Sequence, residues 1–397
     1  MELNTKNRKL TSLLEILIVS TKLGLTSFGG PIAHLGYFRE EYVRRKKWID
    51  DQNYADLVAL SQFLPGPASS QVGIGIGVIR AGVLGGIVSF IGFTLPSVIV
   101  LILFALLLQD LDIKNSGWIH GLKLVAVPIV AQAILGMVKN LTPDLKRKAL
   151  ALFAMIATLI WQTTFTQIAV ILISSIVGYL LYQDNENSDK TTLVTNISKK
   201  VSIICLAIFF ILLVLLPLIS SFTASKWISI FDSFYRAGSM VFGGGHVVLP
   251  LLEREFVPTG WLNKETFLAG YGVTQAVPGP LFTFASYLGT VMAGWRGGLI
   301  ATIAIFLPAF LLILGTLPIW ASMRRNSKLR RALLGVNAAV VGILISAFIN
   351  PIWISSIFSI VDFLIVAVLF CMLVMMKLPP WVIVLVGAIS GEILSRI

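Results

Sequence analysis

Two stretches of the chain decide how it folds: SFGGPIAHLGYFREEYV at residues 27–43 and LSQFLPGP at residues 60–67. Both recur in the second half, as VFGGGHVVLPLLEREFV at 241–257 and TQAVPGP at 274–280. The first proline of the PGP motif follows the phenylalanine of the FGG motif by 37 residues in one copy and by 36 in the other, so a single gap aligns them. A duplication of this length predicts two homologous halves.

The alignment extends beyond these motifs. It pairs Glu40 with Glu253, Trp48 with Trp261, Gln62 with Gln275, Ala81-Gly82 with Ala293-Gly294 and Leu95-Pro96 with Leu307-Pro308. Because the matches recur in the same order, chance is a poor explanation for them. We therefore expect a first repeat at residues 1–182, a linker with one membrane-crossing helix at 183–226, and a second repeat at 227–397.

The composition places both repeats in a membrane. Of the 397 residues, 56% are hydrophobic and 13% are charged, and the mean hydropathy is +0.89, whereas soluble domains have about 25% charged residues. Apolar runs at 82–108, 201–221 and 354–376 reach the roughly 20 residues that a helix needs to cross a bilayer. These runs lack the alternation of a membrane β-barrel strand. The sequence therefore predicts an all-α polytopic membrane protein.

The distribution of basic residues between loops predicts that the two repeats are inverted. Residues 39–47 contain five Lys and Arg, while the equivalent residues 253–265 contain two beside three Glu. The bias reverses later, because residues 109–117 contain one Lys and their counterpart 321–331 contains five Lys and Arg. Basic loops stay in the cytoplasm, so equivalent loops are expected on opposite sides of the membrane.

The number of expected crossings agrees with this inversion. The expected spans are 82–108, 118–138, 149–163 and 166–182 in the first repeat, and 297–320, 331–349, 353–376 and 378–394 in the second. An even number of crossings, followed by the single helix at 201–221, starts the second repeat on the opposite side. We expect a multi-pass cell-membrane protein with a cytoplasmic N-terminus.

Each repeat also contains apolar segments that are too short to cross. They occupy 52–64 and 68–80 in the first repeat and 266–277 and 281–293 in the second, on either side of the PGP motif. Proline removes backbone donors and prevents a continuous helix, so each pair predicts a re-entrant hairpin. In transporters with inverted repeats, such broken segments meet near the midplane and form the substrate site.

The residue types at these breaks suit an anion. A helix that starts after a PGP turn presents free N–H groups and the positive end of its dipole, while hydroxyl and amide side chains add donors. The predicted substrate-binding residues are Gly29, Gly30, Gln62, Pro65, Gly66, Pro67, Ser69, Ser70, Gly243, Gly244, Gln275, Pro278, Gly279, Pro280 and Thr283. The alternatives are simple helix kinks and hydroxyls bonded to their own helix.

Four titratable residues follow the FGG motifs. For His34 and His246, coupling of transport to protons competes with simple packing in the core. For Glu40 and Glu253, which lie toward the loops, a role in gating or proton relay competes with a solvated helix end. The sequence leaves these alternatives open.

Other functional classes find little support in the sequence. The net charge of +12 comes from short loops between apolar runs, which indicates topology signals and no nucleic-acid partner. Cys205 and Cys371 lie in apolar runs without paired spacing, so we expect neither a disulfide nor a metal site. The chain has no nucleotide-binding loop and no nucleophile triad. We therefore expect no cofactor and no enzymatic activity.

The FGG and PGP motifs, at this spacing and in both halves, resemble the chromate ion transporter family in its long, two-domain form. The motif residues of the family match Phe28, Gly29, Gly30, Pro31, His34, Pro65, Gly66, Pro67, Phe242, Gly243, Gly244, Pro278, Gly279 and Pro280. The resemblance implies a secondary transporter that exports chromate from the cytoplasm, driven by the membrane potential or a proton gradient. Gly245 replaces the proline of the motif, which puts an equal role of the two halves in doubt. A sulfate or other anion transporter, an anion channel and a lipid-modifying membrane enzyme remain alternatives, and a homo-oligomer stays open.

Overall fold

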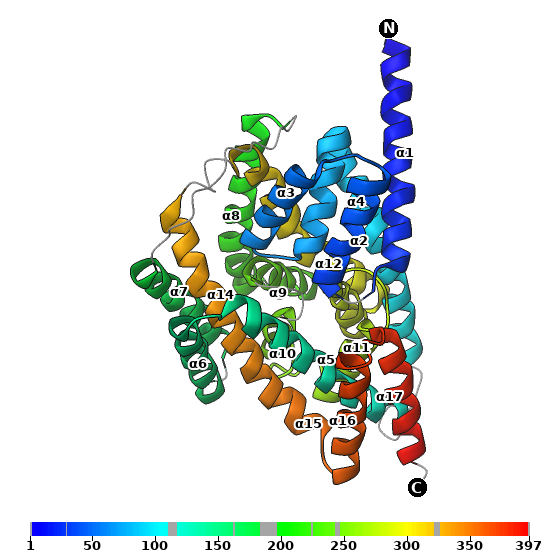
Figure 1. Ribbon diagram of the computed structural model, residues 1–397, viewed down its shortest axis with the longest axis vertical. Coiled ribbons are helices and arrows are strands. Elements are labelled where there is room, and N and C mark those ends of the chain that lie inside the picture. Colours follow the sequence, from blue (N-terminus) through cyan, green and yellow to red (C-terminus); the bar gives the residue numbers. More distant parts are fainter. Residues whose placement is uncertain are drawn as a thin grey trace.

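The computed structural model describes residues 2–28, 30–109, 117–161, 163–182, 197–223, 225–242, 247–320 and 326–395. The regular elements in these ranges are helices (Figure 1). Within them, the helices long and apolar enough to cross a membrane are Ala68–Leu108, Gly117–Leu141, Lys199–Phe222, Leu281–Ile319 and Ser327–Ser356. The prediction of an all-helical fold with several apolar helices is therefore confirmed for the described residues, and these helices have the length and composition of membrane-crossing segments.

The first repeat begins with a long helix that ends at the FGG motif. Its elements are α1 (Glu2–Thr26), α2 (Gly30–Phe38), the π-helical η1 (Arg39–Arg45), α3 (Asp51–Phe63), α4 (Ala68–Gln109), α5 (Gly117–Leu141), α6 (Leu145–Ile160) and α7 (Thr164–Leu181). The Asp50 side chain caps α3 by accepting a hydrogen bond from the Asn53 N–H, which satisfies a free donor of the first turn. Pro65 and Pro67 then separate α3 from α4, because proline has no N–H to continue a helix.

A single helix, α8 (Lys199–Phe222), leads into the second repeat. Its elements are α9 (Lys226–Met240), α10 (Val248–Phe256), α11 (Lys264–Thr274), the 3-10 turn η4 (Leu281–Thr283), α12 (Phe284–Thr316), η5 (Leu317–Ile319), α14 (Ser327–Ala347), η6 (Phe348–Trp353), α15 (Ile354–Ser356), α16 (Ile360–Val374) and α17 (Pro380–Leu394). The span expected at 353–376 begins only at Ile360, where Ser359 and Asp362 form a capping box. Such a box satisfies two free donors and defines a helix start.

Both long helices that follow the PGP turns are kinked at the same aligned position. Ala81 and Gly82 leave helical geometry in α4, and Ala293 and Gly294 do so in α12. Each kink divides a short half-helix after the PGP turn from a longer apolar part, as the sequence predicted. The same order of short helix, PGP turn, half-helix, kink and spanning helix therefore occurs twice.

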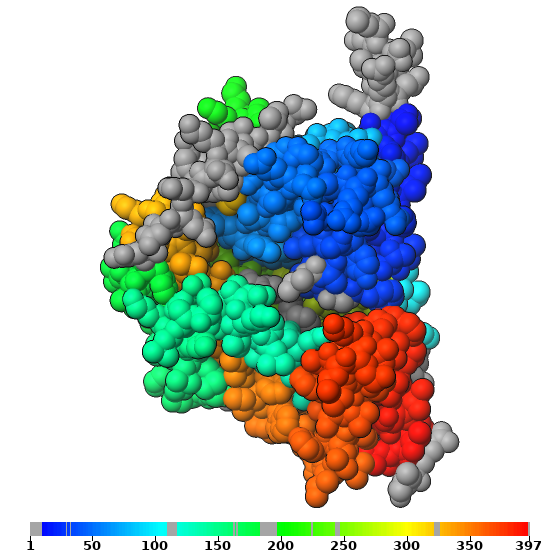
Figure 2. All heavy atoms as spheres, viewed as in Figure 1, coloured from blue at the N-terminus to red at the C-terminus, as the bar shows by residue number. Residues whose placement is uncertain are grey.

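The helices of the two repeats are interleaved. Helix α14 packs against α6 and α7, α5 packs against α16 and α17, and α4 packs against α12 (Figure 1). In Figure 2 the blue N-terminal helices and the red C-terminal helices lie at opposite ends of the view, with teal α5 and α6 beside the red and orange helices. Glycines make the crossings close: a Cβ on Gly335 would meet the Ser174 carbonyl, and a Cβ on Gly121 would meet the Gly387 carbonyl. Each repeat thus completes its core with helices of the other.

Candidate functional site

Each PGP turn is hydrogen-bonded to the FGG segment of the other repeat. The Gly66 N–H of the first turn donates a hydrogen bond to the Val241 carbonyl, directly before the second FGG motif, at 2.7 Å. The Gly279 N–H of the second turn donates to the Ser27 carbonyl, directly before the first FGG motif, at 2.9 Å. Ser27 and Val241 are aligned positions, so the two bonds are equivalent. We call the two PGP turns together with Ser27 and Val241 the crossed breaks.

Each PGP turn also lies against the long helix of the other repeat. A Cβ on Gly66 would lie 3.1 Å from the Ala309 Cβ of α12, and a Cβ on Gly279 would lie 2.9 Å from the Ser97 Oγ of α4. Ser97 and Ala309 are again aligned positions. Gly66 and Gly279 have φ angles of +112° and +104°, a backbone region that favours glycine. Glycine is therefore required at both turns by conformation and by space.

The start of α4 supplies the polar side chains of the first PGP turn. The Gln71 Nε2 donates to the Pro65 carbonyl at 2.8 Å, while the Gln71 Oε1 is buried without a hydrogen-bond partner in the described part of the chain. The Ser70 hydroxyl is buried in the same way. Gln62, expected at this turn, has an exposed side chain. The amide at the turn thus comes from Gln71, and its place in the first turn of α4 was the available sequence signal.

The second PGP turn is built differently. Gln275 ends α11 and is buried, and its Nε2 has no hydrogen-bond partner within the described ranges. The Thr283 hydroxyl donates to the Pro280 carbonyl at 2.7 Å, whereas the aligned Ser70 hydroxyl makes no such bond. The two turns therefore present different donors at aligned positions.

His34 of α2 lies beside the first PGP turn. The residue is 1% exposed, its Nδ1 lies 3.3 Å from the Ser69 Oγ at the start of α4, and its ring meets the Phe93 ring edge-on at 5.6 Å. The Nε2 has no hydrogen-bond partner among the described residues. Which nitrogen carries the proton is set by such contacts, so His34 offers the site one further donor or acceptor.

Unpartnered polar atoms gather around the crossed breaks. The buried atoms without a hydrogen-bond partner among the described residues include Ser27 Oγ, His34 Nε2, Ser61 Oγ, Ser70 Oγ, Gln71 Oε1, Thr94 Oγ1 and Gln275 Nε2. A buried polar group left unpaired costs about 1–3 kcal/mol, so native proteins keep several together mainly where water or a ligand satisfies them. All but the Gln71 oxygen can donate. A small anion can accept hydrogen bonds from several such donors at once.

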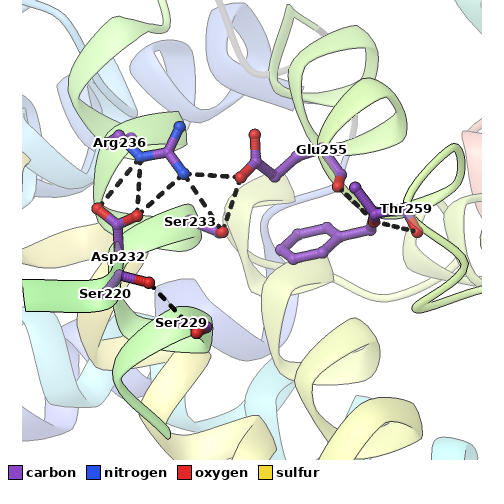
Figure 3. A network of polar contacts seen from close by, with 8 residues as sticks. Ser220, Ser229, Asp232, Ser233, Arg236, Glu255 and Thr259 are labelled. Atoms are coloured by element: carbon purple, nitrogen blue, oxygen red, sulfur yellow. Dashed lines mark hydrogen bonds and ion pairs between the residues drawn. The ribbon is translucent and has the colours of Figure 1, made fainter. Parts of the chain in front are cut away.

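We call the helices on the two sides of an FGG motif an FGG hairpin, which is α1 with α2 and η1 in the first repeat and α9 with α10 in the second. One ion pair joins the two sides of each FGG hairpin. Lys22 of α1 and Glu41 of η1 lie 2.9 Å apart, and Arg236 of α9 and Glu255 of α10 lie 2.7 Å apart. Figure 3 shows that Arg236 also binds Asp232 and Ser233. The two pairs occupy aligned positions. Glu41 therefore corresponds to Glu255, which shifts by one residue the match of Glu40 with Glu253 drawn from the sequence.

The remaining predicted site residues have other environments. Glu40 pairs with Arg44 and Arg45 on an exposed face, at 3.3 and 3.4 Å, and Glu253 is partly buried. Gly30 is buried at the start of α2. The predicted residues Gly29, Gly243, Gly244 and His246, and Gly245 with them, lie outside the described residues.

The chain is similar in sequence to known transport proteins over most of its length. The profile of the chromate transporter family matches residues 14–179 and again residues 228–392. A probable chromate transport protein of Synechococcus elongatus is 28% identical over 96% of this chain and 95% of its own length. A chromate transport protein of Pseudomonas aeruginosa is 26% identical over 81% of this chain and 77% of its own length. An uncharacterized transporter of Methanocaldococcus jannaschii is 27% identical over 87% of this chain and 86% of its own length.

No solved structure shows significant similarity to this chain. The family profile nevertheless covers most of both repeats, including the FGG and PGP motifs that form the crossed breaks. The chain therefore belongs to the chromate transporter family.

Proposed function

We propose that this protein is a secondary transporter that exports chromate from the cytoplasm. Family membership supports the substrate, since relatives that match most of this chain are named as chromate transport proteins. The observation that carries the proposal is the group of unpartnered donors at the crossed breaks. Chromate is a tetrahedral dianion, and its four oxygens can accept hydrogen bonds from several hydroxyl and amide groups at once.

Neutral donors also suit a site that must release its ligand. Hydrogen bonds from a Lys or Arg to a dianion are roughly twice as strong as those between neutral groups. A neutral donor contributes about 0.5–1.5 kcal/mol, so several together give selectivity without holding the anion permanently. Transport requires this balance, because the substrate has to enter and leave the same site.

We further propose that the repeats have inverted topology and that the N-terminus is cytoplasmic. The opposite charge bias of equivalent loops supports the inversion. The equivalent hydrogen bonds from Gly66 and Gly279 support a two-fold relation between the repeats. With inverted repeats, the Lys22–Glu41 and Arg236–Glu255 pairs hold one hairpin each on opposite sides of the membrane. Alternate release of the two hairpins then opens the crossed breaks to one side at a time.

Chromate uptake into inverted membrane vesicles tests the proposed function. Vesicles that contain the protein should accumulate chromate above the level of vesicles from cells without it. Sulfate should compete because it has the same shape and charge, and chloride should compete poorly. Separate collapse of the membrane potential and of the pH gradient identifies the driving force. Strong chloride competition without a sulfate effect would support an anion channel, and sulfate uptake without chromate uptake would support a sulfate transporter.

A further inference from the structure

Arg254 of α10 is a buried cation outside the crossed breaks. The residue is only 8% exposed. Its Nη2 donates to the Thr158 carbonyl near the end of α6 at 2.7 Å and to the Ser346 hydroxyl of α14 at 3.5 Å. Its Nη1 is buried and has no hydrogen-bond partner among the described residues. The guanidinium thus keeps one complete NH₂ group for a further acceptor.

A comparison with Arg236 of α9 shows what Arg254 lacks. Two carboxylates neutralise Arg236, Asp232 at 3.0 Å and Glu255 at 2.7 Å (Figure 3). Within the described part of the chain no carboxylate forms an ion pair with Arg254, and the adjacent Glu253 attracts it only through space. Arginine stays charged at all ordinary pH values. A buried charge without a partner is strongly destabilising, and a bound anion removes this penalty.

A second polar side chain, from α7, also reaches α10. The Gln167 Nε2 of α7 lies 3.5 Å from the Pro250 carbonyl, one helical turn before Arg254. The Gln167 Oε1 is buried without a hydrogen-bond partner among the described residues. The free Gln167 oxygen is an acceptor and carries no charge, so the junction of α6, α7, α10 and α14 gives Arg254 neutral polar neighbours and, among the described residues, no counter-ion.

We propose that Arg254 binds a tetrahedral oxyanion as its counter-ion, at a second position on the transport path. This inference rests on the proposed function, because it takes the bound anion to be the transported one. The free Nη1 group has two N–H bonds, and both can donate to the oxygens of one anion. Helix α10 follows the second FGG motif in the sequence, and this closeness along the chain is what links Arg254 to the crossed breaks in the proposal. The aligned residue of the first repeat is Glu40, which is exposed and paired with Arg44, so the two repeats differ at this position.

Equilibrium binding of radiolabelled sulfate to the purified full-length protein tests the site. Arg254→Met keeps much of the side-chain length without charge, and Arg254→Lys keeps the charge without the fork. Arg296→Gln is the matched control, because Arg296 is exposed on α12 over the Trp295 ring and its loss changes the net charge equally.

The expected result is a rise of about tenfold or more in the Kd of one of the two sulfate sites in Arg254→Met, because charge-assisted hydrogen bonds are lost, while the site at the crossed breaks keeps its wild-type Kd. Arg254→Lys should have an intermediate Kd, and Arg296→Gln should bind as the wild type does. Equal sulfate Kd values for Arg254→Met and Arg296→Gln would overturn the inference. If Arg254→Met does not fold, the lysine variant decides, and a Kd unchanged from wild type overturns it.

Thermal unfolding separates anion binding from a structural role. Without sulfate, Arg254→Met should unfold at a midpoint no lower than wild type, since an unpaired buried charge becomes an apolar group. Sulfate should raise the wild-type midpoint more than that of the variant. Equal destabilisation of the variant with and without sulfate would assign Arg254 a purely structural role.

Chromate uptake distinguishes a failure of this inference from a failure of the proposed function. Wild-type vesicles that take up no chromate would refute the transport proposal, whatever sulfate does at Arg254. Active wild-type vesicles combined with an unchanged KM in Arg254→Met would refute only the role of Arg254.

Discussion

A methyl group at Gly279 should loosen the contact between the two repeats. Gly279 has a φ angle of +104°, and a Cβ there would lie 2.9 Å from the Ser97 Oγ and 3.5 Å from the Gly24 carbonyl. The backbone conformation costs about 1–2 kcal/mol for a residue with a side chain, and overpacking costs about 1–3 kcal/mol more. We therefore expect Gly279→Ala to lower the free energy of unfolding by about 2–5 kcal/mol.

Two further variants separate the contributions of backbone strain and of overpacking to this loss of stability. Gly294 has a φ angle of +66°, but a Cβ there meets nothing within 4 Å. Because its ψ angle is −172°, a combination that is essentially restricted to glycine, Gly294→Ala should cost backbone strain alone, about 1–3 kcal/mol. In Gly279→Ala with Ser97→Ala, the nearest Ser97 atom is the Cβ at 3.4 Å, so the double variant should recover the overpacking part. The Ser97→Ala single variant completes the double-mutant cycle.

Denaturant titration of the purified protein in detergent, followed by tryptophan fluorescence, measures these free energies. Chromate uptake by the same variants shows whether the contact also supports transport. If Gly279→Ala is no less stable than Gly294→Ala, and Ser97→Ala restores nothing, the second PGP turn does not pack against α4. The contact of each PGP turn with the other repeat would then be refuted.

Three further predictions concern the site, the ion pairs and the topology. Gln275→Ala should raise the KM for chromate by about 2- to 10-fold because it removes one donor, whereas Gln62→Ala, at an exposed position, should leave KM unchanged; equal effects would remove Gln275 from the site. Lys22→Glu and Glu41→Lys should each lower stability by roughly 1 kcal/mol and slow uptake, and the double reversal should restore part of both; a double variant as poor as the singles would contradict a role of this ion pair. Single cysteines at Arg45 and Ser327 should react only with reagents on the cytoplasmic side, and one at Thr259 only from outside; labelling of the Arg45 and Thr259 positions from the same side would contradict inverted repeats.

Much of the fold was predictable because it depends on local chemistry. The length of an apolar run sets whether a helix can cross a membrane, so the spans at α5, α7 and α8 were expected within a few residues. Pro65 and Pro67 cannot continue a helix, so the break between α3 and α4 was expected as well. Helix α16 begins at Ile360 and not at the expected residue 353, because Pro351 interrupts the earlier segment and the capping box at Ser359 sets the helix start. The hydrophobic pattern alone did not reveal this boundary.

The candidate site was less accessible to sequence analysis. Ser70 and Gln275 were expected at the PGP turns, and both carry buried polar atoms without a partner among the described residues. Gln62 aligns with Gln275 but has an exposed side chain, and Gln71 takes its place. The face of a short helix that becomes buried depends on its tertiary neighbours, which are α4 and η1 of the same repeat for α3 but include α5 of the other repeat for α11. Whether these residues bind chromate stays a prediction.

The sequence by itself determined the duplication, the helical class and the two PGP breaks, because repeated motifs, apolar length and proline act within a few residues of the chain. Only the tertiary structure decided that each PGP turn is bonded to the FGG segment of the other repeat, through Gly66 with Val241 and Gly279 with Ser27. It also decided that Arg236 has two carboxylate partners while Arg254 is buried without one in the described part of the chain. The physical reason is that apolar helices of two similar repeats pack equally well within a repeat or across both. Hydrogen-bond and charge partners are chosen only when that packing brings distant residues within about 3 Å of each other.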